Sequence, residues 1–220
     1  MPMPRTDPLN LDGSPASHLS LERLVFFSDA VIAIAMTLLA ADLRVPQLDP
    51  AAAVRDLPSV LVAARPQIVS FAISFVVIGI YWLSHHRTFS YITRYDGRLA
   101  VLNLMFLFFI VIMPFVARVY GEYAYLPFST LAYSLTVGGI GLAQAFIWLY
   151  ATRDHRLVDP TLDDRVIAAG NLRNFLGALI FLVAGPAALL SIPLSFVLWW
   201  LSPIVVIFSV RVYNRRHASN

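Results

Sequence analysis

The 220-residue sequence contains no cysteine and no lysine, and charged residues make up only 13% of it. Without cysteine, the chain cannot form disulfide bonds, bind a metal through thiolates or use a cysteine nucleophile. Hydrophobic residues reach 59%, against about 45–50% in typical soluble domains, and the mean hydropathy is +0.72. A water-soluble fold has nowhere to bury so much apolar surface. The composition therefore excludes a soluble or disordered chain and predicts an all-α, polytopic membrane protein.

All sixteen basic residues are arginine, and they give a net charge of +3 and an isoelectric point near 9.4. This basicity does not require a nucleic-acid partner, because arginine gathers at the cytoplasmic ends of membrane helices. The first nineteen residues are mostly polar and lack the apolar segment of a signal peptide. We therefore interpret residues 1–19 as a disordered cytoplasmic tail.

Long stretches without Asp, Glu or Arg divide the rest of the chain into membrane spans, each needing about 20 mostly apolar residues. The stretch between Arg173 and Arg211 holds 37 residues, enough for two helices, and Gly185-Pro186 and Pro193 predict a tight hairpin between them. The other stretches hold one helix each. Five spans are thus predicted at about 66–86, 99–120, 125–151, 166–186 and 191–211.

A sixth span, at about 20–42, comes first in the chain and carries a carboxylate, Asp29. Ser20 is a suitable N-cap for this helix. Burying a charged carboxylate in lipid costs at least about 2.5 kcal/mol, so Asp29 must face protein or water. The six spans form a single transmembrane domain over residues 20–211, followed by a cytoplasmic tail at 212–220.

Six spans put both termini on the same side of the membrane. With the N-terminus inside, twelve arginines lie on the inner side and four on the outer side, so the positive-inside rule predicts two cytoplasmic termini in a bacterial inner membrane. Residues 51–65 resemble a short amphipathic stretch at the outer interface. No segment resembles the carbonyl filter of a re-entrant pore loop.

The first span has two distinct faces on a helical wheel. Ala33, Met36 and Ala40 lie near Asp29, whereas another face carries apolar and small residues at helical spacing. That face consists of Ala30, Ile34, Thr37, Leu38 and Ala41. It fits close helix packing, since small residues let helices approach, and it also fits the lining of a narrow pore. Periodicity alone leaves both interpretations open.

The second span ends in Trp82, His85 and His86. Adjacent histidines lie about 100° apart on a helix and cannot bind one metal from the same face, so no metal site is predicted. A polar cluster that joins His85 or His86 to Asp29 and Ser28 fits better, because a carboxylate in a membrane requires such partners. Asn103 and Gln144 are expected to form interhelical hydrogen bonds.

These motifs resemble those of the transmembrane protein 175 family, whose members are potassium-permeable channels. The resemblance is carried by the first span, by the end of the second and by the third, over about residues 20–120. The matching residues are Arg23, Phe27, Ser28, Asp29, Ala30, Ala33, Ile34, Thr37, Leu38, Leu39, Trp82, His85, His86, Arg87, Phe89, Asn103, Pro114 and Phe115.

The resemblance implies a homotetramer in which four first helices surround a passive potassium pore. It implies an apolar constriction at Ile34, a threonine ring at Thr37 that K⁺ passes, and further apolar layers at Leu38 and Ala41. Arg23, Phe27, Ser28 and Asp29 would hold helices and subunits together. The expected selectivity for K⁺ over Na⁺ is modest. No cofactor, nucleic acid or soluble substrate is implied; the partners are membrane lipids and other copies of the chain.

Two other functions are compatible with individual features of the sequence. A proton-coupled secondary transporter would use Asp29 with His85 or His86 as a relay. A membrane-embedded enzyme or assembly factor would rest on the same histidines and on the polar loop at 153–165. The missing internal repeat speaks against the transporter.

Overall fold

The computed structural model describes residues 15–41, 43 and 50–217. Six of its helices are long and apolar enough to cross a membrane, as predicted. They are α1 (Pro15–Ala41), α3 (Arg65–Tyr91), α4 (Gly97–Tyr123), α5 (Pro127–Thr152), α6 (Asp164–Leu190) and α7 (Ile192–His217). A shorter helix, α2 (Pro50–Ala63), precedes α3, and the 3₁₀ turn η1 (Arg153–His155) follows α5. The all-α fold predicted from composition is confirmed.

The helix starts follow from local chemistry. Pro66 and Pro127 lie in the first turns of α3 and α5, where the missing N–H would have no intrahelical partner. The Asp96 carboxylate caps α4 by accepting from the Leu99 N–H at 2.8 Å. Asp163 does the same for α6, from the Arg165 N–H at 2.7 Å. Each cap satisfies an amide that the helix itself leaves unpaired.

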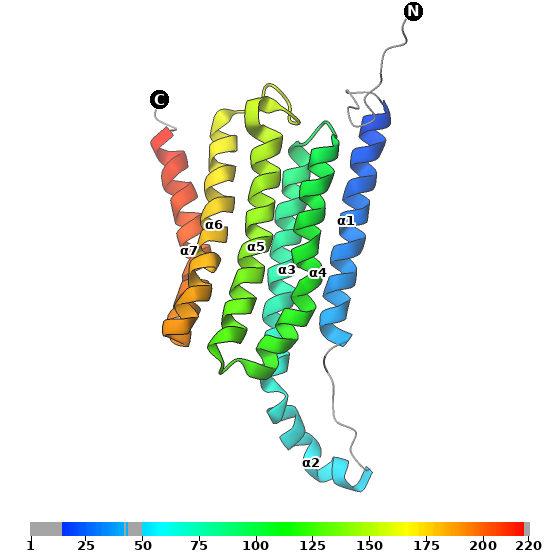
Figure 1. The fold of residues 1–220 in the computed structure, drawn as a ribbon, viewed down its shortest axis with the longest axis vertical. Helices are drawn as coiled ribbons and strands as arrows, with labels where there is room; N and C mark the ends of the chain where they lie inside the picture. Colours follow the sequence, from blue (N-terminus) through cyan, green and yellow to red (C-terminus); the bar gives the residue numbers. More distant parts are fainter. Residues whose placement is uncertain (1–14, 42, 44–49, 218–220) are drawn as a thin grey trace, which may run out of the picture.

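The bundle is arranged around α5, which lies between α3 and α4 on one side and α6 and α7 on the other (Figure 1). Helix α1 lies at one edge and α7 at the opposite edge (Figure 1). Among the described residues, α1 contacts only α3 and α4. Most of the surface of α1 is therefore left uncovered by its own subunit.

Glycines let the helices around α5 approach closely. A Cβ added to Gly138 would lie 2.7 Å from Leu182 Cδ2 on α6, and one added to Gly139 would lie 2.5 Å from Phe109 Cε1 on α4. Real Cβ atoms essentially never show such short contacts, so a larger residue at either position would force the facing side chain to move. The glycines at 138–141 therefore allow α4 and α6 to pack closely against α5.

Four helix ends lie four or more residues from those expected: the start of α1 and the ends of α3, α6 and α7. Helix α3 continues to Tyr91 instead of ending at about residue 86. Helix α1 begins at Pro15 rather than Ser20, so residues 15–19 are helical instead of part of a disordered tail. Proline is a favourable first residue, which explains the earlier start. Helix α7 continues past Arg211 to His217, because the arginines at its end do not oppose a helix once it leaves the apolar layer.

The hairpin between the last two helices lies at Ser191, between Gly185-Pro186 and Pro193 as predicted, but helix α6 ends at Leu190 instead of at about residue 186. Helix α6 runs through Pro186, which costs one backbone hydrogen bond and is tolerated in membrane helices. Gly185 lies against α5, where an added Cβ would be 3.1 Å from Leu131 Cδ1. Packing against α5 thus outweighs the local helix-breaking tendency of Gly-Pro.

The ends of the bundle agree with six crossings. Helices α1, α4 and α6 run in one direction and α3, α5 and α7 in the other, so Pro15 and His217 lie at the same end (Figure 1). At that end the α3–α4 and α5–α6 connections are joined. The Thr93 N–H donates to the Leu157 carbonyl at 2.8 Å, and the Tyr150 hydroxyl donates to Asp96 at 2.5 Å.

The expected amphipathic stretch at 51–65 forms α2, with Leu57, Leu61 and Val62 exposed. Arg55 and Asp56 pair with each other at 3.0 Å. Helix α2 is too short to span a membrane.

Candidate pore-lining face and polar network

One face of α1 is buried against its own subunit. Its residues recur at helical spacing and pack against α3 and α4: Ser28, Ile32, Ala35 and Leu39. This spacing identifies a single stripe along the helix. The stripe fixes the rotation of α1 and determines which side chains point away from the bundle.

The opposite face of α1 carries the residues singled out as possible pore lining. Ile34 is 58% exposed and Leu38 is 47% exposed, and Thr37 and Ala41 are exposed as well. The centre of this face lies about 140° from the buried stripe, at about 100° per residue. None of these four residues therefore serves the core of the subunit.

The Thr37 hydroxyl donates within its own helix and can act only as an acceptor toward other groups. Its hydroxyl donates to the Ile34 carbonyl at 2.8 Å. Because the only hydroxyl proton is used within the helix, the oxygen lone pairs remain available as acceptors. The exposed side of Thr37 is thus suited to contact a cation rather than an anion.

A buried polar network joins α1, α3 and α4. The Asn103 amide donates to Ser28 Oγ at 2.8 Å, and Asn103 Oδ1 is 2.8 Å from His85 Nε2. The Ser28 hydroxyl donates its own hydrogen bond to the Leu24 carbonyl at 2.8 Å. His85 must donate to the Asn103 oxygen, so its proton lies on Nε2.

His85 is completely buried and stacks between two aromatic rings. The ring centroids of Phe89 and Phe106 lie 4.3 and 5.0 Å from that of His85. Its Nδ1 atom has no hydrogen-bond partner. A second proton there would be buried without an acceptor, so the geometry favours the neutral ring.

Asp29 belongs to a separate contact on the other side of α1. The Trp82 indole N–H donates to Asp29 Oδ1 at 2.9 Å. His86 is exposed, and its ring centroid lies 6.2 Å from that of Trp82. The expected cluster is therefore divided: Ser28 reaches His85 through Asn103, whereas Asp29 contacts Trp82 and neither histidine.

The remaining motif residues of α1, Arg23 and Phe27, are exposed. The interhelical role expected for Asn103 is confirmed, and so is that of Gln144, whose amide donates to Thr88 Oγ1 at 2.7 Å. The sequence did not indicate that Asn103 would bridge Ser28 and His85. Only the order of neighbouring helices reveals that link, and a single sequence does not contain it.

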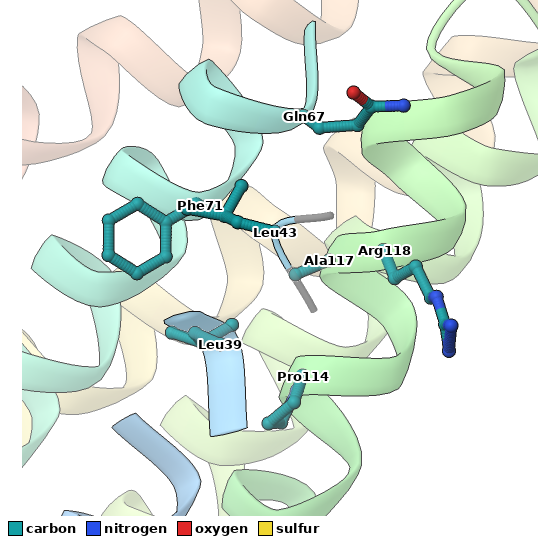
Figure 2. Close-up of a pocket in the computed structure, with 7 residues that line it drawn as sticks. All are labelled: Leu39, Leu43, Gln67, Phe71, Pro114, Ala117 and Arg118. Atoms are coloured by element: carbon teal, nitrogen blue, oxygen red, sulfur yellow. The ribbon is translucent and has the colours of Figure 1, made fainter. Parts of the chain in front are cut away.

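A small pocket lies near the end of α1 that follows Leu39 (Figure 2). Residues from α3 and α4 complete it, and its volume is about 30 Å³, room for about one water. The lining residues are Leu39, Leu43, Gln67, Phe71, Pro114, Ala117 and Arg118. Within the described residues, no group of three or more acidic or histidine side chains could hold a metal ion.

The exposed face of α1 therefore carries apolar residues and a threonine, while hydrogen bonds to α3 and α4 hold the polar residues of the helix in place. Residues 23–114 match the family model described as the endosomal/lysosomal potassium channel TMEM175. The chain is 35% identical over 177 residues to a Streptomyces collinus protein named potassium channel, covering 79% of this chain and 84% of that protein.

A more distant relative is the Rattus norvegicus endosomal/lysosomal proton channel TMEM175, 26% identical over 85% of this chain but only 37% of its own length. The fold matches the crystal structure of a lysosomal potassium-selective channel TMEM175 homologue from Chamaesiphon minutus, with a TM-score of 0.69 and 26% identity. That match covers 90% of this chain and 98% of the other. The chain therefore belongs to the TMEM175 family of ion channels.

Proposed function

We propose that the protein is a passive, potassium-permeable channel in which four copies of the chain surround one pore. The observation that carries this proposal is the difference in burial between two faces of α1. One face is buried against α3 and α4, and the other leaves Ile34, Thr37, Leu38 and Ala41 exposed. In a fourfold arrangement the exposed faces of the four α1 helices point toward one another, because the helices then meet at the central axis.

The exposed residues suggest how such a pore conducts and closes. A ring of four isoleucines at Ile34, with a second apolar ring at Leu38, stops ions by excluding water. Four Thr37 oxygens replace part of the hydration shell of a passing K⁺. Since this ring offers fewer oxygens than a carbonyl filter, the preference for K⁺ over Na⁺ is modest. Ala41 is small and leaves the pore wider at that level.

The polar contacts behind the pore face hold α1 in position. Asp29 accepts from Trp82 on α3, and Ser28 accepts from Asn103 on α4. Because these two hydrogen bonds extend from different sides of α1, they resist rotation of the helix about its own axis. Arg23 and Phe27 are exposed on α1, and we assign them to contacts between subunits.

We place the channel in a bacterial inner membrane with both termini in the cytoplasm. Twelve of the sixteen arginines then lie on the cytoplasmic side, as the positive-inside rule requires. Helix α2 lies at the outer interface in this orientation, where its exposed apolar residues contact lipid.

The proton-coupled transporter is disfavoured by the same contacts. A relay between Asp29 and His85 needs a continuous chain of hydrogen bonds. Asp29 instead contacts Trp82, and His85 contacts Asn103. An indole N–H donates but cannot accept a proton in exchange, so it ends such a chain.

Ion flux from liposomes that contain the purified protein tests the proposed function. We expect potassium flux to exceed sodium flux by a small factor and to persist when a protonophore removes the proton gradient. Protein-free liposomes provide the control. A flux that disappears with the proton gradient would contradict a passive channel and restore Asp29 and His85 as candidates for coupling.

A further inference from the structure

Two arginines from different helices lie together without a carboxylate partner. Arg87 is on α3 and Arg173 is on α6, and their guanidinium groups are close enough for Arg87 to act electrostatically on Arg173. Tyr91, one turn after Arg87, acts on the same group. Arg173 is half-buried and Arg87 is exposed. Two like charges that act on each other at a half-buried position repel unless an anion lies between them.

The helix packing places both arginines at one level of the bundle. Trp148 of α5 donates to the Ile167 carbonyl of α6 at 3.1 Å. Its ring also meets that of Tyr91 on α3, with centroids 5.6 Å apart. Helices α3 and α6 thus flank the same part of α5. Arg87 lies one helical turn before Tyr91, and Arg173 lies about one turn after Gly170, which packs against the Trp148 ring. Both arginines are therefore displaced from this tryptophan toward the middle of the bundle.

The described carboxylates nearest to these two arginines along the chain, at the starts of α4 and α6 and in the α5–α6 connection, have other partners. Asp96 caps α4 and binds Tyr150, and Asp163 caps α6. Asp154 and Asp164 lie within 4.0 Å of Arg153 and His155, respectively. Among the residues that the structure describes, neither Arg87 nor Arg173 forms an ion pair. An anion from outside the described part of the chain would balance the two charges.

The depth and position of the pair favour a lipid. Helix α6 has 27 residues, about 40 Å at 1.5 Å per residue, so it exceeds a hydrocarbon core of about 30 Å. Its first turns therefore reach the headgroup layer, and long arginine side chains extend toward that layer. Helix α6 makes no contact with α1 among the described residues, so Arg173 lies away from the proposed pore face, and Arg87 is exposed on α3.

We propose that Arg87 and Arg173 form a binding site for the phosphate of an anionic phospholipid. Arginine binds phosphate through two parallel N–H···O bonds, and a pair of guanidinium groups can hold one phosphodiester from both sides. Tyr91 and Trp148 are aromatic residues of the kind found at the headgroup level. This site depends on the membrane-spanning fold but not on the proposed potassium permeation.

Native mass spectrometry of the purified full-length protein in detergent tests the site with phosphatidylglycerol as the probe and phosphatidylcholine as the neutral comparison. We expect the wild type to retain phosphatidylglycerol preferentially, with about one strongly bound molecule per subunit. The Arg87→Gln/Arg173→Gln variant should retain at least about fivefold less. Arg165→Gln removes the same charge from the exposed start of α6 and should retain the lipid as the wild type does.

The remaining outcomes separate the possible sources of the anion. Equal retention by the double variant and the wild type would overturn the proposal. Displacement of the lipid by excess inorganic phosphate would also overturn it, by showing a site for soluble anions. Loss of the oligomer in the variant, with lipid retention unchanged, would assign the pair to a carboxylate of another copy. The phosphate competition uses wild-type protein, so it remains decisive if the double variant does not fold. The single variant Arg87→Gln changes only an exposed side chain and can then replace the double variant.

Discussion

Neighbouring residues on α1 serve different helices. Ser28 and Asp29 differ by about 100° on the helical wheel, which is why Ser28 reaches Asn103 on α4 while Asp29 reaches Trp82 on α3. The need of Asp29 for a polar partner could be predicted from its place in an apolar span. The identity of that partner could not, because Trp82 is 53 residues away in sequence and either histidine of the same motif was chemically suitable.

The Asp29–Trp82 contact can be measured by a double-mutant cycle. Asp29→Ala should lower the stability of the folded oligomer by about 1–3 kcal/mol, because a charge-assisted hydrogen bond is lost. Trp82→Phe should have a similar effect, and the double variant should cost less than the sum. Thermal unfolding followed by size-exclusion chromatography supplies the measurement. Additive losses would show that the two residues do not interact in the membrane-embedded protein.

At the scale of the helices, the sequence predicts how many membrane-spanning helices form better than it predicts the residues at which they begin and end. Arginine spacing locates the six spans because a charge in the hydrocarbon layer is costly. Gly185-Pro186 and Pro193 bracket the break between α6 and α7 but do not identify the residue at which α6 ends, since Pro186 continues the helix while Ser191 ends it. That difference arises from the packing of Gly185 against α5, which is a tertiary contact. Periodicity grouped Ile34, Thr37, Leu38 and Ala41 on one face of α1, which is the exposed face. It did not identify the buried stripe of Ser28, Ile32, Ala35 and Leu39, because that stripe depends on where α3 and α4 lie.

The close packing of α5 predicts that Gly→Ala changes at two different glycines will differ in their effect on stability. Gly138→Ala should destabilise the bundle, because the new methyl group would lie 2.7 Å from Leu182. Gly79→Ala on α3 is the matched control, since nothing in the subunit lies within 4 Å of its added Cβ. That control should be neutral or stabilising by a few tenths of a kcal/mol, as expected from helix propensity. Equal thermal stability of the two variants would contradict the proposed packing constraint.

At the scale of the whole molecule, α1 lies at the edge of the subunit and exposes a face that the subunit does not cover (Figure 1). The absence of native cysteine makes the position of this face easy to test. Ile34→Cys should give covalent dimers when the oligomer is oxidised or treated with a short bis-maleimide. Val183→Cys, on the exposed side of α6, should remain monomeric on a denaturing gel. Dimers from Val183→Cys but not from Ile34→Cys would place α6, rather than α1, at the centre.

The central claim is that ions pass along the exposed face of α1, and the most direct test is potassium flux from liposomes that contain the Ile34→Asn variant. A polar side chain at the constriction should hydrate it, so we expect a severalfold faster flux than in the wild type. Val183→Asn makes the same change at a similarly exposed position on α6 and should leave the flux unchanged. Equal flux in the wild type and Ile34→Asn, from oligomers of equal stability, would contradict the account and move the ion path away from this face.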